Sequence, residues 1–98
     1  MKLVYLPEID NDLDRLYNFL INNAASLKTA DKALLRIKQG ANTLIDHPEL
    51  GISLGDGTER RELSLDFGKG AYIIRYVPDY EHKEILILRI WHSKEVRD

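Results

Sequence analysis

The chain has 98 residues, of which 44% are hydrophobic and 31% charged, so it can form one small domain spanning 1–98 but not two domains of ordinary size. Its 14 basic and 16 acidic residues give a net charge of -2, which excludes the large basic surplus of proteins that bind nucleic acid through their overall charge. Cysteine is absent, which excludes disulfides and thiolate metal sites. We expect no cofactor and no bound metal.

The start of the chain indicates no targeting segment. Met1 and Lys2 are followed closely by Pro7, Glu8 and Asp10 instead of the apolar core of a signal peptide. No apolar run is long enough to span a membrane. We therefore expect a cytoplasmic protein with no membrane partner.

The first elements are predicted to be a strand and a helix. Residues 2–6, KLVYL, favour a strand, and Pro7 is typical of the first turn of a helix. Acidic residues in that first turn would interact favourably with the helix dipole; they are Glu8, Asp10 and Asp12. Apolar residues at steps of three and four form one buried stripe, which consists of Ile9, Leu13, Leu16, Tyr17 and Leu20. The helix is expected to end at Asn22 and Asn23.

A second helix is predicted to start at a cap formed by Ser26 or Thr29 and to end at His47, because a residue before proline avoids the α conformation. Its apolar face consists of Leu27, Ala30, Leu34, Ile37, Ala41, Leu44 and Ile45. We interpret its cations, Lys28, Lys32, Arg36 and Lys38, as a solvated face instead of a nucleic-acid track. Residues 49–58, which contain three glycines, are predicted to form a loop.

Three strands are predicted between Arg60 and His92, separated by turns at 66–70 and 78–83. The first of these strands alternates between apolar and polar residues, so one face is expected to be buried. The last strand is apolar on both faces, which predicts cover on both sides. Because two helices cover only one face of a small sheet, this strand indicates a protein partner. The order of elements predicts an α+β fold.

Several short motifs together resemble the RelE/ParE toxins of bacterial type II toxin-antitoxin systems, including those known as plasmid stabilisation proteins. The motifs cover nearly the whole chain and are Asp12-Leu13, His47-Pro48 with Gly51 after it, Arg61-Glu62-Leu63, residues 67–72, Arg75-Tyr76 and residues 88–92. The resemblance implies a βααβββ microdomain whose helical hairpin packs on one face of a small, mainly antiparallel curved sheet. It also implies a co-expressed antitoxin, ParD-like or similar, that wraps and neutralises the toxin.

The resemblance implies one of two activities. RelE-like members cleave messenger RNA on the ribosome without a metal, and ParE-like members inhibit DNA gyrase by binding it. The ribosome-dependent members are strongly basic, and many carry a catalytic tyrosine in the C-terminal tail. This chain is slightly acidic, and residues 93–98 contain no tyrosine. We therefore favour a ParE-like gyrase inhibitor that is not an enzyme, with a RelE-like endoribonuclease as the alternative and a member that only binds its antitoxin as a third.

The candidate site residues lie in the predicted strands and the tail. The acid, base and phosphate-binding groups of a nuclease would be drawn from His92, Arg61 and Arg75. The target of a gyrase inhibitor would contact Arg89, His92, Lys94 and Arg97. The antitoxin would contact Trp91, Ile87 and Ile85.

Each candidate also has a structural interpretation. His92 has a side chain that titrates near neutral pH, but a His at a strand end often anchors the next turn by a backbone hydrogen bond. Arg61 would pair with Glu59 or Glu62. Trp91 would pack in the core or under the antitoxin.

Strand alternation gives the expected directions of these side chains. Arg75 is expected on the face of Ile73 and Val77. Arg89 is expected on the face of Ile87 and Trp91, and His92 on the face of Leu88 and Ile90. Alternation alone does not decide whether the candidates meet at one pocket.

Overall fold

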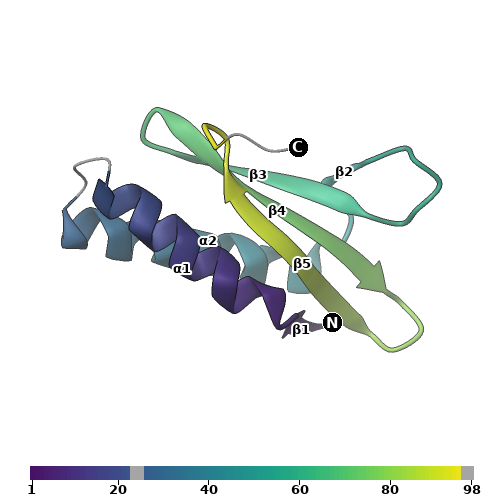
Figure 1. Cartoon of the computed structure of the whole chain (residues 1–98). Helices are drawn as coiled ribbons and strands as arrows, with labels where there is room; N and C mark the ends of the chain where they lie inside the picture. Colours follow the sequence, from purple (N-terminus) through teal and green to yellow (C-terminus); the bar gives the residue numbers. More distant parts are fainter. Residues whose placement is uncertain (23–25, 96–98) are drawn as a thin grey trace.

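The computed structural model describes residues 1–22 and 26–95, within which two helices and five strands follow one another in the order β1, α1, α2, β2, β3, β4, β5 (Figure 1). The helices are α1 (Glu8–Asn22) and α2 (Leu27–Asp46). The strands are β1 (Lys2–Tyr5), β2 (Ile52–Ser53), β3 (Arg61–Phe67), β4 (Gly70–Asp79) and β5 (Glu84–His92). The predicted α+β fold, with its strand, helix, helix and strand order, is confirmed.

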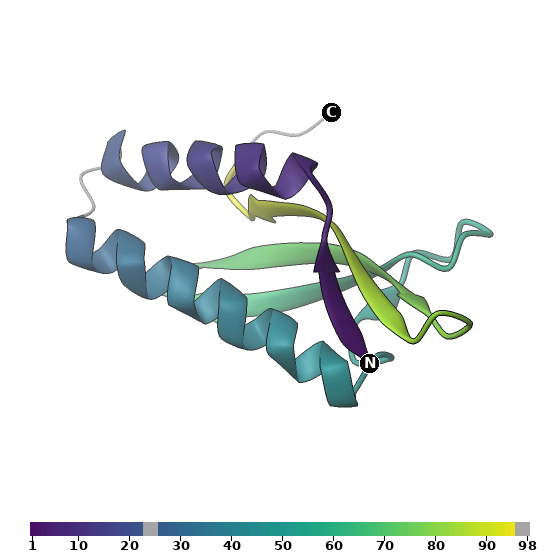
Figure 2. The same cartoon turned by 90° about the horizontal axis from the view of Figure 1, so that it is seen from below.

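The strands form one mixed sheet in the order β1-β5-β4-β3-β2. The first and last strands of the chain, β1 and β5, pair in parallel from Lys2 opposite Glu84 to Tyr5 opposite Ile87. The other pairs are antiparallel. Both helices lie on the same side of the sheet (Figure 2). The opposite face, called the outer face below, is covered by no described helix.

The helix ends follow local sequence signals. The Ser26 hydroxyl caps α2 by accepting a hydrogen bond from the Thr29 amide at 3.1 Å, so Ser26 is the cap among the two expected candidates. The helix ends before His47, as expected for a residue that precedes proline. The first helix ends at Asn22; the predicted stop at Asn23 lies outside the described residues.

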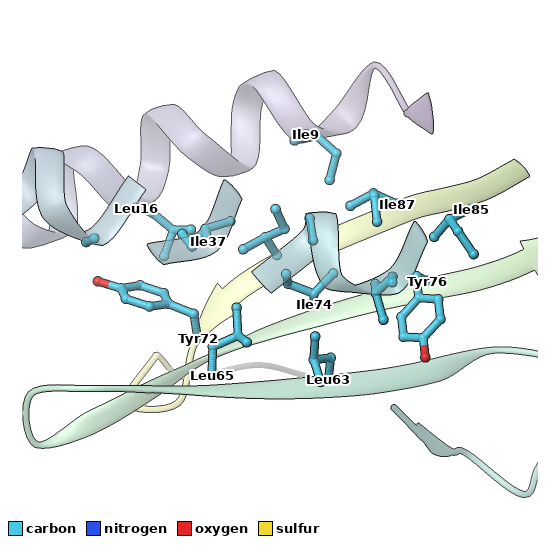
Figure 3. Close-up of a cluster of buried hydrophobic side chains, with 14 residues drawn as sticks. Ile9, Leu16, Ile37, Leu63, Leu65, Tyr72, Ile74, Tyr76, Ile85 and Ile87 are labelled. Atoms are coloured by element: carbon cyan, nitrogen blue, oxygen red, sulfur yellow. The ribbon is translucent and has the colours of Figure 1, made fainter. Parts of the chain in front are cut away.

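The core lies between the helices and the inner face of the sheet (Figure 3). Its side chains are Ile9, Leu16, Ala33, Ile37, Ala41, Leu44, Leu63, Leu65, Tyr72, Ile74, Tyr76, Ile85, Ile87 and Ile90. The rings of Tyr72 and Tyr76 occupy opposite ends of this cluster (Figure 3). Because these two residues come from the same strand, the long axis of the core follows β4.

The predicted loop at 49–58 contains a short strand that the sequence did not indicate. In β2, Ile52 pairs with Glu62 and Ser53 with Arg61. The segment before it is fixed by Tyr76, whose hydroxyl donates to the Pro48 carbonyl and accepts from the Gly51 amide, both at 2.8 Å. A two-residue strand shows no alternation, and its pairing depends on this distant tyrosine.

The side-chain directions expected for the last strand are wrong at Arg89, because a bulge interrupts the pairing of β4 with β5. Arg75 pairs with Arg89 and Tyr76 with Ile87, so the pairing skips Leu88. The side-chain alternation therefore shifts by one residue at this position. Ile87, Ile90 and His92 share the inner face, and Arg89 does not lie on the face of Ile87 as alternation predicted.

No helix among the described residues is long and apolar enough to cross a membrane.

Candidate functional site

The second half of β5 is bordered by α1 instead of a strand. Pairing with β1 ends at Ile87, and beyond it the backbone of Ile90 bonds to two side chains of α1. The Ile90 amide donates to the Asp12 carboxylate at 2.9 Å, and the Ile90 carbonyl accepts from the Arg15 guanidinium at 2.8 Å. Asp12 and Arg15 thus satisfy backbone groups that a neighbouring strand would otherwise satisfy.

Asp12 is a buried carboxylate, only 1% exposed, held by two arginines. Arg15 donates to it at 2.6 Å, and Arg89 donates twice, at 2.9 and 3.0 Å. Burial alone would raise the pKa of Asp12, but the hydrogen bonds from Arg89, the Ile90 amide and Arg15 outweigh burial and lower it. The carboxylate is therefore ionised at neutral pH and joins α1 to β5.

The segment His92–Glu95, called the C-terminal turn below, is fixed by hydrogen bonds to β4, within itself and to α1. Ser93 exchanges two hydrogen bonds with Ala71 at the start of β4, at 2.8 and 3.0 Å. The Glu95 carboxylate accepts from the His92 amide at 2.7 Å, while the Glu95 amide donates to the His92 carbonyl at 2.9 Å. Arg15 donates to the same carboxylate at 2.7 Å, which ties the turn to α1.

The imidazole of His92 is packed into this end of the core and is 8% exposed. Its ring lies 5.4 Å from the ring of Phe19 and 5.1 Å, edge to face, from that of Tyr72. The Lys94 amide donates to Nδ1 at 3.0 Å, which is the turn-anchoring arrangement described for a His at a strand end. Burial lowers the pKa of His92; Glu95 opposes this shift and Lys94 adds to it.

The four residues expected to contact a target differ in their surroundings. Lys94 is exposed, whereas Arg89 is bonded to Asp12 and His92 is buried. Residues 94 and 95 are thus part of a hydrogen-bonded turn. Arg97 lies outside the described residues.

The three nuclease candidates do not meet at one pocket. Arg61 pairs with Tyr76 along β4 and His92 pairs with Tyr72, so they are four residues apart along the strand, about 13 Å at ~3.3 Å per residue. Arg75 lies on the outer face, where it donates to Glu62 at 2.7 and 2.9 Å.

Arg61, at the start of β3, also has partners other than those expected. Arg61 donates to the backbone carbonyls of Gly51 at 2.7 Å and Glu49 at 3.4 Å, not to Glu59 or Glu62. Among the described residues, no group of three or more His, Asp or Glu side chains is arranged to hold a metal ion.

The residues expected to contact an antitoxin lie on two different faces. Ile85 and Ile87 are fully buried under the helices, so neither remains in the partner surface expected from the sequence. Trp91 is half-buried on the outer face, with the Arg75 guanidinium 5.0 Å from its ring centre. Half-buried apolar residues surround this pair; they are Ile73, Val77, Leu86 and Leu88.

A second apolar surface lies on the helical side. It is a groove of about 370 Å³ between α1 and α2, lined by Tyr5, Ile9, Asp10, Leu13, Leu34, Ile37, Lys38 and Ile90. The structure therefore offers a partner the outer face and this groove.

The sequence did not predict the cluster that Asp12, Arg15 and Glu95 form. Asp12 was explained by the helix dipole, and Arg15 and Glu95 were assigned no role. One signal was present, because Asp12 lies between Ile9 and Leu16 on the buried stripe of α1. A charged residue in that position indicates a buried partner of opposite charge.

The chain shares its fold with a solved structure and part of its sequence with a curated toxin. The structure described as the chromosomal ParDE TA system from P. aeruginosa has a TM-score of 0.72 to this chain and covers 92% of both chains, at 24% identity, which shows a shared fold. Toxin RelE1 from Caulobacter vibrioides is 36% identical over 61 residues, which are 62% of this chain and 61% of that protein's length.

The family model for the ParE toxin of the type II toxin-antitoxin system parDE matches residues 3–97. Because this match covers nearly the whole chain, the protein belongs to the ParE toxin family. The resemblance to RelE/ParE toxins inferred from the sequence motifs is confirmed.

Proposed function

We propose that this protein is a ParE-like toxin that inhibits DNA gyrase by binding it and that acts in the cytoplasm. The observation that carries the choice of target is the separation of His92, Arg61 and Arg75, since metal-independent RNA cleavage requires an acid, a base and cations around one phosphate. Membership of the ParE family and the net charge of -2 support the same choice.

A gyrase supercoiling assay tests the target. Toxin freed from its antitoxin is expected to block supercoiling by purified gyrase and to leave translated messenger RNA intact. The same preparation is added to a translation extract with purified ribosomes, and the messenger RNA is mapped for breaks. Ribosome-dependent cleavage with unimpaired supercoiling would reverse the assignment in favour of a RelE-like endoribonuclease.

We further propose that a cognate antitoxin, ParD-like or similar, neutralises the toxin by covering the outer face. The support is the half-buried apolar surface around Trp91, which the helices leave uncovered. Leu88 is central to this argument because it lies on the outer face with Leu86, and the bulge places Arg89 beside it. A partner on this face would bury roughly 1,600 Å² in total or more.

Copurification with the product of the neighbouring gene tests the partner. The wild-type toxin is expected to copurify with it, and Leu88→Arg is expected to reduce the amount bound because a charge would be buried in the interface. Asn42→Arg, on the exposed face of α2, places the same charge elsewhere and is expected to leave binding unchanged. Equal binding by both variants would remove the outer face from the interface.

A further inference from the structure

The Arg15 side chain joins three parts of the molecule that are distant in sequence. It donates to Asp12 on its own helix, to the Ile90 carbonyl on β5 and to the Glu95 carboxylate of the C-terminal turn. Its guanidinium matches this geometry because it presents several donors in one plane, which a lysine ammonium does not. The described backbone bonds of the turn involve β4 and β5, so Arg15 provides its described hydrogen bond to α1, in addition to the ring contact of His92 with Phe19.

The partners of Arg15 differ in how firmly they are held. Asp12 is buried and also bonded by Arg89 and the Ile90 amide, so its position is fixed without Arg15. Glu95 lies on the turn itself and follows Lys94, which is exposed. Loss of the Arg15–Glu95 pair therefore affects the turn first and leaves the attachment of α1 to β5 in place.

We propose that Arg15 is a positioning residue that, through Glu95, fixes the C-terminal turn in the orientation needed for toxicity without contacting the target. This inference rests on the proposed function and on the expectation from the sequence that Lys94, on the turn, contacts the target. In the wild-type protein the turn is presented as a rigid element, and little conformational entropy is lost on binding. When the pair is broken, Lys94 samples many orientations and binding weakens.

Three variants test this role: Arg15→Gln, Glu95→Gln and the double variant. Glu95→Gln retains an oxygen that accepts from the His92 amide and removes the charge that pairs with Arg15. The matched control is Arg60→Gln, because Arg60 pairs with Asp56 at 2.6 Å and has the same 37% side-chain exposure as Arg15. Arg60 lies between β2 and β3, away from the turn.

Amide hydrogen exchange gives a readout that a general loss of stability would not produce. Both single variants are expected to exchange the Lys94 and Glu95 amides about tenfold faster, equivalent to ~1.4 kcal/mol, with amides of β3 and β4 unchanged. Neither measured amide bonds to Arg15. At these two amides the double variant is expected to match Glu95→Gln, since each single variant already removes the Arg15–Glu95 pair. The control is expected to exchange like wild type.

Growth arrest on induction and gyrase inhibition complete the test. The toxicity of the turn variants is expected to fall about tenfold, with antitoxin binding retained. Unchanged exchange at Lys94 and Glu95, or faster exchange with full toxicity, would overturn the positioning role. If the wild-type toxin arrests growth without affecting gyrase, the proposed target is wrong. The positioning role of Arg15 is then still tested by comparing growth arrest between the wild type and the turn variants.

Discussion

The carboxylate of Asp12 accepts a hydrogen bond from the amide of Ile90 at 2.9 Å, across 78 positions of the sequence. This bond marks the point at which α1 replaces β1 as the neighbour of β5. A helix side chain thus continues the hydrogen bonding of a sheet edge, and the charge that it introduces is balanced by Arg15 and Arg89.

Asp12→Asn is expected to lower the free energy of unfolding by about 2 kcal/mol, because it removes the negative charge between two arginines while retaining one acceptor oxygen. Denaturant unfolding followed by circular dichroism measures the change. Asp14→Asn is the control, since Asp14 is exposed on the same helix. Equal stability of the two variants would show that the negative charge of Asp12 contributes little to the free energy of unfolding.

Tyr76→Phe is expected to cost about 1–2 kcal/mol, because the hydroxyl that holds the Pro48 carbonyl and the Gly51 amide is lost. Tyr80→Phe removes the same atom from an exposed tyrosine whose hydroxyl bonds to Glu49, and is expected to change stability by no more than ~0.5 kcal/mol. Thermal unfolding of both variants provides the comparison. An unchanged melting temperature of Tyr76→Phe would mean that β2 is positioned by other contacts.

Gly51→Ala provides an independent test of the same corner. An added Cβ would lie 2.8 Å from the Tyr76 hydroxyl and 2.9 Å from the Glu62 carbonyl, and the carbonyl belongs to a paired strand. Crowding of this kind typically costs about 1–3 kcal/mol. The expected loss of stability, measured by denaturant unfolding, should be accompanied by faster amide exchange in β2. Wild-type stability would indicate that the 48–51 segment is free to shift.

Stability is expected to decline as the pH falls below about 6.5, because burial lowers the pKa of His92. The unfolded chain then binds a proton that the folded chain binds only at lower pH, so this contribution is complete above the unfolded pKa and is lost as the pH falls through the folded pKa. Protonation of Nδ1 also removes the acceptor of the Lys94 amide.

The difference in unfolding free energy between wild type and His92→Gln, measured from pH 8 to pH 5 in steps of one unit, isolates this contribution. The other histidines, His47 and His82, are present in both proteins and cancel. The advantage of the wild type is expected to shrink toward low pH. A difference that is constant across the range would show that His92 titrates alike in the folded and unfolded chain.

Two truncations test whether the C-terminal turn is part of the fold. Deletion of residues 94–98 removes Glu95 and its bonds to His92 and Arg15, and is expected to cost about 1–2 kcal/mol. Deletion of residues 96–98 retains Glu95 and is expected to preserve the melting temperature more closely. Identical melting curves for the two proteins would show that the bonds of Glu95 add no stability.

Elements with strong local signals could be predicted from the sequence, and those fixed by distant contacts could not. Ser26 and Pro48 define the ends of α2 through their own chemistry, so both were visible. The bulge at Leu88 was not, because the residues on both sides of it are apolar apart from Arg89, so an apolar residue stands on each face with or without a bulge. Asp12 was hidden for another reason, since a favourable dipole interaction already explained an acidic residue near the start of α1.

The candidate site was predicted less completely than the fold. Charge and hydrophobicity identified Arg75, Arg89 and His92 as residues of interest, but not the partner of each one. Those partners are Glu62, Asp12 and the Lys94 amide. Pairing of this kind depends on register across the sheet, which only the assembled structure supplies.

The parallel pairing of β1 with β5 has a consequence for synthesis of the toxin. The ribosome makes β1 first and β5 last, so Lys2–Tyr5 has no strand to join until residues 84–87 have emerged. Asp12 likewise waits for Ile90. Contacts so distant along the chain slow folding and delay it until translation is nearly complete. A nascent toxin is therefore expected to remain inactive on the ribosome, which leaves time for a neutralising partner to meet it before its fold closes.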